Sequence, residues 1–474
     1  MTLPAKFVER VLRDLGGTEG AALCAALDAE PPVSVRLNPA KTGAETVSAG
    51  PDAGLPVPEA AGLPALAIAG RVPWSRDGRY LAVRPSFTLD PDFHAGAYYV
   101  QEASSQFVGH LLAAVRTEGA RILDLCAAPG GKTTLYASLA GPDGLVVANE
   151  IDRRRASVLA DNVRKWGTGN VAVTTCEPRA LGDFEAWFDV VAVDAPCSGE
   201  GMFRKDPDAR GEWSEGNVKQ CAARQDEILR EAWRALRPGG TLVYSTCTFN
   251  RDEDEGALER MAAWAGDEIA ESEETAVEDA WGIVCGRVGA FRTFRFYPHR
   301  TCGEGFFAAV ARKSFDAGGR VRAPKARRTV FAAVDRKTAG ELARWVRNPG
   351  GMHFAAVADT CYSWYAAQAD AVRTLSEALP VIYSGVALGQ VFKGVLKPDP
   401  ALAFFDGMNR GALPAAELDD EETLRFLRRQ DIAAGGLAEG MNLVCSRGRA
   451  LGFAKRIGAR VNNLYPSSLR IIKQ

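Results

Sequence analysis

Five short apolar segments alternate with helical stretches between residues 121 and 249, and this alternation constrains the fold more than any other feature. The segments read RILDLCA, GLVVANE, NVAVTTCE, FDVVAVDAP and TLVYSTCTF, and they are rich in β-branched residues. Apolar runs separated by helices indicate strands that are buried on both faces, so we predict a parallel sheet of βαβ units. The later segment FRTFRFYPHRTCGEGFFAAVARK (291–313) contains a turn and is predicted to close the sheet as a hairpin.

The first predicted strand leads into a loop of small residues with a Pro-Gly-Gly turn, ILDLCAAPGGKTTL (122–135). This loop is not a nucleotide P-loop, because Cys126 stands where that motif needs its first glycine. Glycines at the start of a helix let a ligand approach the backbone closely. Glu150 follows the next strand at a distance that suits a ribose diol. The pattern favours S-adenosylmethionine over a merely structural turn beside a surface glutamate.

Acidic and thiol side chains stand where the predicted strands end. In an open parallel sheet, ligands bind outside the carboxyl ends of the strands, so these side chains are expected to share one crevice with the cofactor loop. A free cysteine is often only a small buried hydrophobe. Two cysteines beside a methyl-donor loop nevertheless favour covalent chemistry. The residues concerned are Asp124, Glu150, Glu177, Asp194 and Cys247, with Cys197 just past the end of a strand.

Methylation of cytosine at C5 is a reaction that needs such groups. A thiolate that adds to C6 makes C5 nucleophilic toward a methyl sulfonium, which divides one difficult step into easier ones. Asp194 is placed to donate a hydrogen bond from a protonated carboxyl to N3 or O2 of the base. The proton left on C5 must go before the sulfur can leave, and Cys197 is the candidate for that step. The attacking thiol must be stabilised as a thiolate or lose its proton as it adds.

Six segments spread over nearly the whole chain carry a resemblance to a known family: YYVQEASSQ (98–106), DLCAAPGGKT (124–133), NEID (149–152), VDAPCSGEGMFRKDP (193–207), YSTCTFN (244–250) and NLYPSSLRI (463–471). Through them the sequence resembles the RNA cytosine-5 methyltransferases of the NOL1/NOP2/Sun type, and most closely their bacterial ribosomal-RNA members. The resemblance implies that Cys247 is the C6 nucleophile and that Cys197 assists release of the methylated product.

The same resemblance implies a set of contacts to S-adenosylmethionine. The family usually has Asp-Gly where this chain has Glu177-Pro178, so Glu177 would have to reach the adenine amino group in place of an aspartate. The implied cofactor residues are Cys126, Ala127, Ala128, Pro129, Gly130, Gly131, Lys132, Glu150, Glu177 and Asp194.

The expected fold is α/β, with a Rossmann-like class I methyltransferase core between an N-terminal α+β module and a C-terminal PUA-like, β-rich extension. We predict five parts: an N-terminal RNA-interacting module (1–95), the S-adenosylmethionine-dependent methyltransferase core (96–313), a basic linker (314–328), an intermediate domain (329–400) and a PUA-like RNA-binding domain (401–474).

Three basic segments are candidates for RNA contact, and each has a structural alternative. SVRLNP (34–39) resembles an RNA-contacting segment of the family, but it fits a buried strand equally well. Arg204 and Lys205 follow the Cys197 loop and would meet a phosphate or simply face solvent. Residues 446–474 carry seven Lys or Arg and no Asp or Glu, which would make RNA binding steeply salt-dependent. Residues 252–279, with twelve Asp or Glu, are typical of a solvated face.

Composition and cysteine usage exclude several other classes. The net charge is −2, so local basic patches must hold any RNA. No apolar run approaches the ~18 residues of a membrane helix, and the N-terminal segment is amphipathic without the apolar stretch of a signal peptide. Ten scattered cysteines without a Cys-x-x-Cys pair argue against a zinc site and against a dense disulfide framework. We therefore expect a cytoplasmic monomer that binds no metal.

The sequence thus predicts transfer of a methyl group from S-adenosylmethionine to C5 of a cytosine in RNA. By resemblance, the partner is 16S rRNA or the small ribosomal subunit. Two alternatives stay open: a tRNA cytosine-5 methyltransferase, and a non-catalytic RNA-binding factor of ribosome assembly that keeps the fold. Retention of both cysteines, Asp194 and the whole glycine loop argues against the second.

Overall fold

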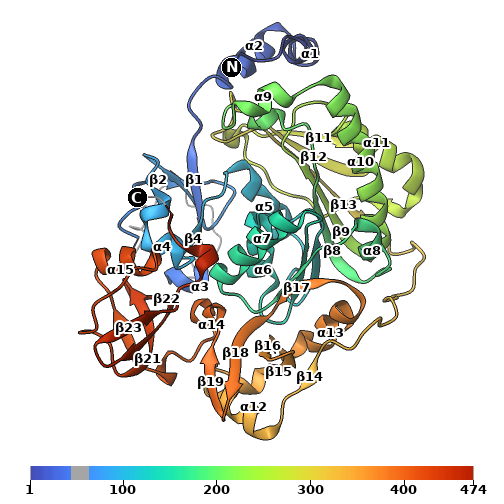
Figure 1. The fold of residues 1–474 in the computed structure, drawn as a ribbon. Helices are drawn as coiled ribbons and strands as arrows, with labels where there is room; N and C mark the ends of the chain where they lie inside the picture. Colours follow the sequence, from blue (N-terminus) through green and yellow to red (C-terminus); the bar gives the residue numbers. More distant parts are fainter. Residues whose placement is uncertain (1, 44–62, 473–474) are drawn as a thin grey trace.

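A computed structural model describes residues 2–43 and 63–472 of the 474-residue chain. In these ranges the strands form four sheets, and the largest of them runs through the middle of the molecule (Figure 1). The N-terminal helices lie at the top of the view and the C-terminal strands at its lower left. The architecture is an α/β core with an N-terminal α+β part and a C-terminal β-rich part, as the sequence predicts.

The N-terminal helices pack on the loops that follow two core strands. The amphipathic pattern of the first residues is confirmed by α1 (Ala5–Leu15), which is followed by α2 (Gly17–Ala26). Phe7 is fully buried and its ring contacts those of Phe203 and Phe249 edge-on or tilted. Because Phe203 and Phe249 follow the two candidate cysteines in sequence, α1 covers the segments that lead away from the site.

The N-terminal sheet contains the segment SVRLNP as a buried strand. Its order is β2-β3-β1-β4, so β1 has a neighbour on each side, and its side chains from Ser34 to Leu37 are buried. The structure therefore supports the buried-strand alternative for residues 34–38, whose side chains are not open to a phosphate. The elements of this part are β1 (Val33–Leu37), α3 (Pro39–Thr42), β2 (Ile68–Arg71), β3 (Gly78–Leu81), α4 (Pro91–His94) and β4 (Tyr98–Tyr99).

The core sheet confirms the five predicted parallel strands and the closing hairpin. Its order is β11-β12-β13-β9-β8-β5-β6-β7-β17, with β10 paired to β13. Strands β5 to β9 are parallel, whereas β12 and β13 pair antiparallel. Their bounds are β5 (Arg121–Asp124), β6 (Leu145–Asn149), β7 (Val171–Thr174), β8 (Phe188–Asp194), β9 (Leu236–Thr246), β10 (Ile269–Ala270), β11 (Val284–Val288), β12 (Phe291–Phe296) and β13 (Phe306–Lys313).

Helices bury both faces of this sheet. Successive strand residues point to opposite faces, so Leu123 and Val191 belong to one apolar cluster and Ile122 and Val190 to the other. Side chains of α10, α11 and α13 complete the first cluster, and those of α5, α6 and α7 complete the second. The core helices are α5 (Phe107–Ala113), α6 (Gly131–Ala140), α7 (Arg153–Trp166), α8 (Pro178–Gly182), α9 (Asp208–Glu212), α10 (Glu215–Ala235) and α11 (Glu255–Ala265).

The segment predicted as an intermediate domain is joined to the core sheet. Strand β17 (Val381–Ser384) pairs antiparallel with β7 at the sheet edge, and α13 (Ala369–Ala378) packs in the core cluster. Through this pairing the segment is attached to the core, while its other strands form a separate sheet of order β14-β15-β16-β18-β19. The other elements here are β14 (Ala332–Ala333), α12 (Arg336–Ala343), β15 (Met352–Val357), β16 (Thr360–Tyr365), β18 (Val386–Phe392) and β19 (Val395–Pro398).

The C-terminal sheet docks on the N-terminal part through two arginines of the basic tail. Arg447 forms ion pairs with Asp90, Asp92 and Asp420, and Arg449 forms one with Asp92 at 2.8 Å. Asp92 is fully buried, so these cations hold two parts of the chain together. The elements are α14 (Pro400–Phe404), β20 (Ala415–Glu417), α15 (Asp420–Leu427), β21 (Gly440–Ser446), β22 (Arg449–Ile457) and β23 (Arg460–Asn463).

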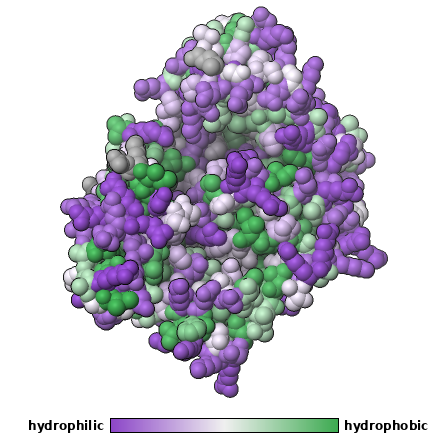
Figure 2. All heavy atoms as spheres, viewed as in Figure 1, coloured by the Kyte–Doolittle hydropathy of each residue, from purple (hydrophilic) through white to green (hydrophobic). Residues whose placement is uncertain are grey.

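The surface is mainly hydrophilic, and Figure 2 shows a hollow between the N-terminal helices at the top and the core beneath them. Helices long and apolar enough to cross a membrane are absent from the described part of the chain. Over residues 2–43 and 63–472, no group of three or more His, Cys, Asp or Glu side chains is arranged to hold a metal ion. All ten cysteines are free thiols.

Candidate active site

The predicted site residues stand at the carboxyl edge of the core sheet. Asp124 ends β5, Glu150 directly follows β6, Asp194 ends β8 and Cys247 directly follows β9. Glu177 follows β7 less closely; it precedes α8 as its N-cap residue and is exposed. The parallel order of β9, β8, β5, β6 and β7 thus brings residues far apart in sequence to one edge.

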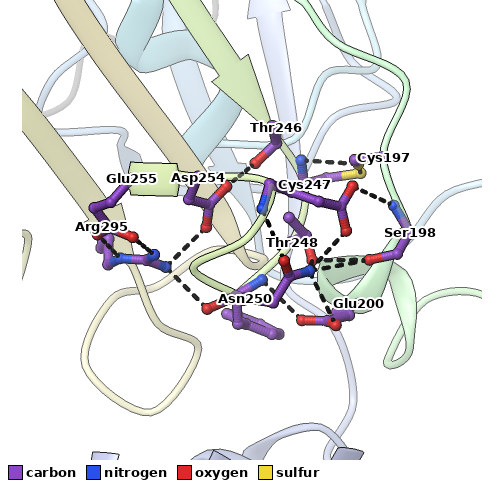
Figure 3. Close-up of polar contacts among 12 residues, drawn as sticks. Cys197, Ser198, Glu200, Thr246, Cys247, Thr248, Asn250, Asp254, Glu255 and Arg295 are labelled. Carbon is purple, nitrogen blue, oxygen red and sulfur yellow. Dashed lines mark hydrogen bonds and ion pairs between the residues drawn. The ribbon is translucent and has the colours of Figure 1, made fainter. Parts of the chain in front are cut away.

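The two candidate cysteines face each other. Their Sγ atoms lie 3.2 Å apart, and the backbone N–H of Cys247 donates to Cys197 Sγ at 3.4 Å (Figure 3). Cys197 lies in the loop after β8 and Cys247 in the loop after β9, and these strands are hydrogen-bonded neighbours. The hydrogen bond with Cys247, together with burial, raises the pKa of Cys197 well above its ordinary value. A thiol held in this way is a strong base once it has ionised.

A buried carboxylate connects the two cysteine loops. Glu253 accepts from the backbone N–H of Ser198 at 2.9 Å, from the amide of Gln225 at 3.0 Å and from the amide of Asn250 at 2.7 Å. The Asn250 amide also donates to the hydroxyls of Ser198 and Thr248 (Figure 3). Burial raises the pKa of the Glu253 carboxyl. Each loop is therefore held by hydrogen bonds to the same few side chains.

The next residue fixes the end of the β9 loop to the closing hairpin. Asp254 accepts from the Thr246 hydroxyl at 2.6 Å and forms an ion pair with Arg295 at 2.9 Å (Figure 3). Arg295 also pairs with Glu255 and donates to the Phe249 carbonyl at 3.1 Å. The acidic run 252–279 is thus not a solvated face throughout, because Glu253 and Asp254 are fully buried.

Asp194 is held between the cofactor loop and β9. Lys132 Nζ lies 2.8 Å from one of its carboxyl oxygens, and the Ser245 hydroxyl donates to the other at 2.7 Å. Burial lowers the pKa of Lys132, but the nearby charges of Asp194 and Asp124 outweigh this and raise it. Both oxygens of Asp194 therefore act as acceptors here. Donation from this carboxyl to a base requires that one of these bonds be exchanged.

The predicted cofactor loop is shaped by glycine and by contacts to its carbonyls. Gly130 has φ +111°, a conformation in which other residues are strained, and it directly precedes α6. Tyr99 and Asn162 donate to the Pro129 carbonyl, at 3.1 and 2.8 Å. Burial raises the pKa of the Cys126 thiol, so this cysteine is held neutral in the loop.

Glu150 lies beside this loop and is nearly fully buried. Arg155 connects the two, because it pairs with the Glu150 carboxylate at 3.2 Å and donates to the Ala128 carbonyl at 3.1 Å. A carboxylate fixed next to a loop of small, uncharged residues is suited to accept hydrogen bonds from the ribose hydroxyls of an adenosine ligand. The residues present therefore fit S-adenosylmethionine.

Arg36 supports the cofactor loop and was missed as a site residue. It donates to Gln101 Oε1 at 2.8 Å, to the Gly131 carbonyl at 3.0 Å and to the Thr134 hydroxyl at 2.6 Å. Its guanidinium lies 4.4 Å from the centre of the Trp166 ring. Arg36 reaches across from the N-terminal sheet, so no local pattern in the sequence reveals these partners.

Arg204 is not available for a phosphate, contrary to the expectation from sequence. Its guanidinium pairs with Glu304 at 3.0 Å and donates to the Gly303 carbonyl, and both side chains of the pair are buried. Neither the phosphate contact nor the solvated alternative is correct for this residue. The neighbouring Lys205 is exposed.

Glu253, Asn250 and Asp254 were also missed. The signal that would have found them is their place, because the acidic run begins only a few residues after Cys247. A dense group of acids next to the end of a buried strand has to fold close to the site that the strand carries. Their partners Gln225 and Arg295 come from a helix and a hairpin that sequence order does not connect to this loop.

Three parts of the chain match known protein families. Residues 3–103 match the N-terminal domain of 16S rRNA methyltransferase RsmF, and residues 111–312 match 16S rRNA methyltransferase RsmB/F. Residues 414–471 match the methyltransferase RsmF PUA domain. These matches follow the order of the N-terminal part, the core and the C-terminal sheet.

The chain is similar over most of its length to ribosomal RNA small subunit methyltransferase F of several bacteria. It is 31% identical to the Shewanella loihica protein, over 84% of this chain and 83% of that one. It is 32% identical to the Erwinia tasmaniensis protein, over 84% of each chain. The similarity therefore covers most of both chains.

Solved structures with a similar fold include PH0851, with a TM-score of 0.56 and 26% identity over 66% of each chain. A methyltransferase homolog protein from Pyrococcus horikoshii gives a TM-score of 0.51 and 26% identity, covering 65% of this chain and 94% of that one. Both comparisons cover about two thirds of the present structure.

Proposed function

Since this chain belongs to the RsmF family of 16S rRNA methyltransferases, we propose that it methylates C5 of a cytosine through a covalent bond between Cys247 and C6. The coarser activity, S-adenosylmethionine-dependent methylation of rRNA, follows from the family. The observation that carries the finer proposal is the pair of thiols 3.2 Å apart at the ends of β8 and β9, beside Asp194. A methyltransferase that acts on oxygen or nitrogen needs no such pair.

The cofactor residues are assigned by their positions around the loop. When bound, S-adenosylmethionine supplies an electrophilic methyl group on a sulfonium. We assign the loop 126–132 to the methionine part, Glu150 to the ribose and Glu177 to the adenine. The salt bridge between Lys132 and Asp194 then joins the cofactor loop to the position of the base.

We assign the two cysteines different roles. Cys247 releases its proton to solvent as its sulfur bonds to C6, and the electron pair of the C5=C6 bond moves to make C5 nucleophilic. Cys197 also gives up its proton to solvent, and after methylation its thiolate accepts the proton from C5. The electron pair re-forms the C5=C6 bond, and Cys247 leaves as a thiolate. The raised pKa of Cys197 keeps its thiol protonated in the free protein, and once that proton has left, the thiolate is a strong base.

The substrate proposed is 16S rRNA, free or in the small subunit, and the enzyme would act in the cytoplasm. The target base has to leave its stack to reach Cys247, which costs a few kcal/mol unless the base is already unpaired. In this proposal, residues 1–95 and 401–474 bind the RNA.

An adduct assay tests the roles of the two thiols. Cys197→Ala should leave the protein attached to methylated RNA on denaturing gels, whereas Cys197→Ala/Cys247→Ala should give no adduct. Cys302→Ala, which removes an exposed cysteine, is the matched control and should behave as wild type. If Cys247→Ala forms the adduct and Cys197→Ala does not, the roles are reversed. Bisulfite sequencing of 16S rRNA from a strain without the gene identifies the cytosine.

A further inference from the structure

A basic cavity outside the methyl-transfer site lies between the N-terminal and C-terminal parts. Its volume is about 420 Å³, and it is bordered by α3, α14 and the turn between β21 and β22, which lie together in Figure 1. Four cations line it, against a single acid, Asp406, among the described residues around it. The cations are Lys41, Arg347, Arg410 and Arg449.

Three of these cations have carbonyl partners in place of carboxylates. Lys41 donates to the carbonyls of Ala95 and Lys165 at 2.7 and 2.6 Å, and Arg410 donates to that of Gly448 at 3.0 Å. Arg347 donates to the backbone carbonyl of Asp406. Asp406 is the one acid among the described residues that line the cavity, and its charge acts on Lys41 and Arg347. These three cations therefore share a single carboxyl group.

The charges in the cavity affect one another. Burial lowers the pKa of Lys41 to about 7 against the opposing charge of Asp406, and the nearby charge of Arg410 contributes to the lowering, so an added anion would favour the charged form of Lys41. Burial raises the pKa of Asp406, whereas the charges of Lys41 and Arg347 lower it, so these cations offset part of the repulsion that its carboxylate would exert on an anion. An arginine guanidinium offers several donors in one plane, a geometry that matches phosphate oxygens.

We propose that this cavity binds one phosphate group of the rRNA backbone, with Arg347 and Arg410 as its main donors. The inference rests on the proposed function for its source of phosphate, and inorganic phosphate has the same chemistry. The cavity lies between the N-terminal part and the C-terminal sheet, which are the two parts that we propose to bind RNA. A phosphate seated there would fix the register of the RNA without reading its sequence.

The test compares RNA binding by wild type and by Arg347→Ala/Arg410→Ala, both at exposed positions, across a range of salt. With a 16S rRNA transcript as the probe, the slope of log K against log salt should fall by about 0.7–0.9, the value for one phosphate. Affinity at low salt should fall about tenfold or more. Arg410→Glu should do the same by reversing the charge. The matched control is Arg344→Ala, an exposed arginine that does not line the cavity.

A second arm separates the sources of phosphate. Inorganic phosphate should raise the melting temperature of wild type more than that of the double variant. If it does so while the RNA slope is unchanged, the cavity binds free anions and the RNA part of the proposal is overturned. If the double variant has the same salt dependence as wild type and phosphate raises neither melting temperature, the cavity is not a phosphate site. A wild-type protein that binds the transcript with the expected slope but leaves its cytosines unmethylated at C5 would overturn the proposed function, and not the cavity.

Discussion

Replacing Arg36 should weaken binding of S-adenosylmethionine and not binding of RNA. The side chain is only 3% exposed, and its hydrogen bonds end on the first turn of α6 and on Gln101. In Arg36→Met, the Gly131 carbonyl and Gln101 Oε1 lose a donor in a buried place. The turn that follows the cofactor loop is then no longer held to the N-terminal sheet.

The magnitude follows from these bonds. Gln101 Oε1 loses its donor outright, which costs about 1–3 kcal/mol, and the Gly131 carbonyl, which still accepts from the Thr134 hydroxyl at 3.0 Å, loses a bond to a charged group that is typically worth about 1.5–3 kcal/mol. Part of this is recovered, because burial of the guanidinium is itself unfavourable; it lowers the pKa of Arg36 to about 10. We expect a net loss of about 2–4 kcal/mol in the free energy of unfolding, and at least about a tenfold rise in the Kd for S-adenosylmethionine.

Calorimetry with S-adenosylmethionine and chemical unfolding measure these two quantities. Arg36→Lys is the matched control, since it keeps a charge but cannot make the same set of bonds; its effect should be intermediate. The reasoning is refuted if Arg36→Met keeps its cofactor affinity and stability while losing RNA affinity, because Arg36 would then face RNA after all.

Three further predictions concern the site itself. Cys247→Ala should abolish methyl transfer but leave the Kd for S-adenosylmethionine within about twofold, because its thiol acts on the base; calorimetry showing loss of cofactor binding would contradict this. Glu253→Ala should lower kcat about tenfold or more, because it leaves three buried hydrogen-bond donors without their acceptor. Glu253→Gln should restore part of the lost kcat. Equal kcat in both variants would argue that Glu253 does not position the cysteine loops. Asp124 has a pKa raised to about 7, mainly by burial, so the folded state binds its proton more tightly than the unfolded state. Its contribution to the free energy of unfolding is present at low pH and is lost as pH rises from about 4 to 7. Urea unfolding of Asp124→Asn should therefore give a free energy of unfolding that changes less with pH over this window than that of wild type. An equal change in both proteins would show that Asp124 does not titrate there.

The sequence by itself determined the parallel core sheet and most of the candidate site. Buried parallel strands need continuous apolar runs, and ligands bind where such strands end, so Asp194, Cys197 and Cys247 were recognisable from local pattern alone. The same logic located the glycine loop, because the conformation of Gly130 has to be encoded at that residue. Local rules are sufficient for features that depend on neighbours in the chain.

Only the tertiary structure decided which charged residues serve the fold and which are left for a ligand. Arg36, Arg204 and Arg447 each pair with groups from distant segments, so basic segments that resembled RNA contacts are engaged inside the protein. Glu253 is buried for the same reason, although its acidic neighbours suggested solvent. A charge is buried only where partners from other elements compensate it, and the identity of those partners depends on the packing of the whole chain.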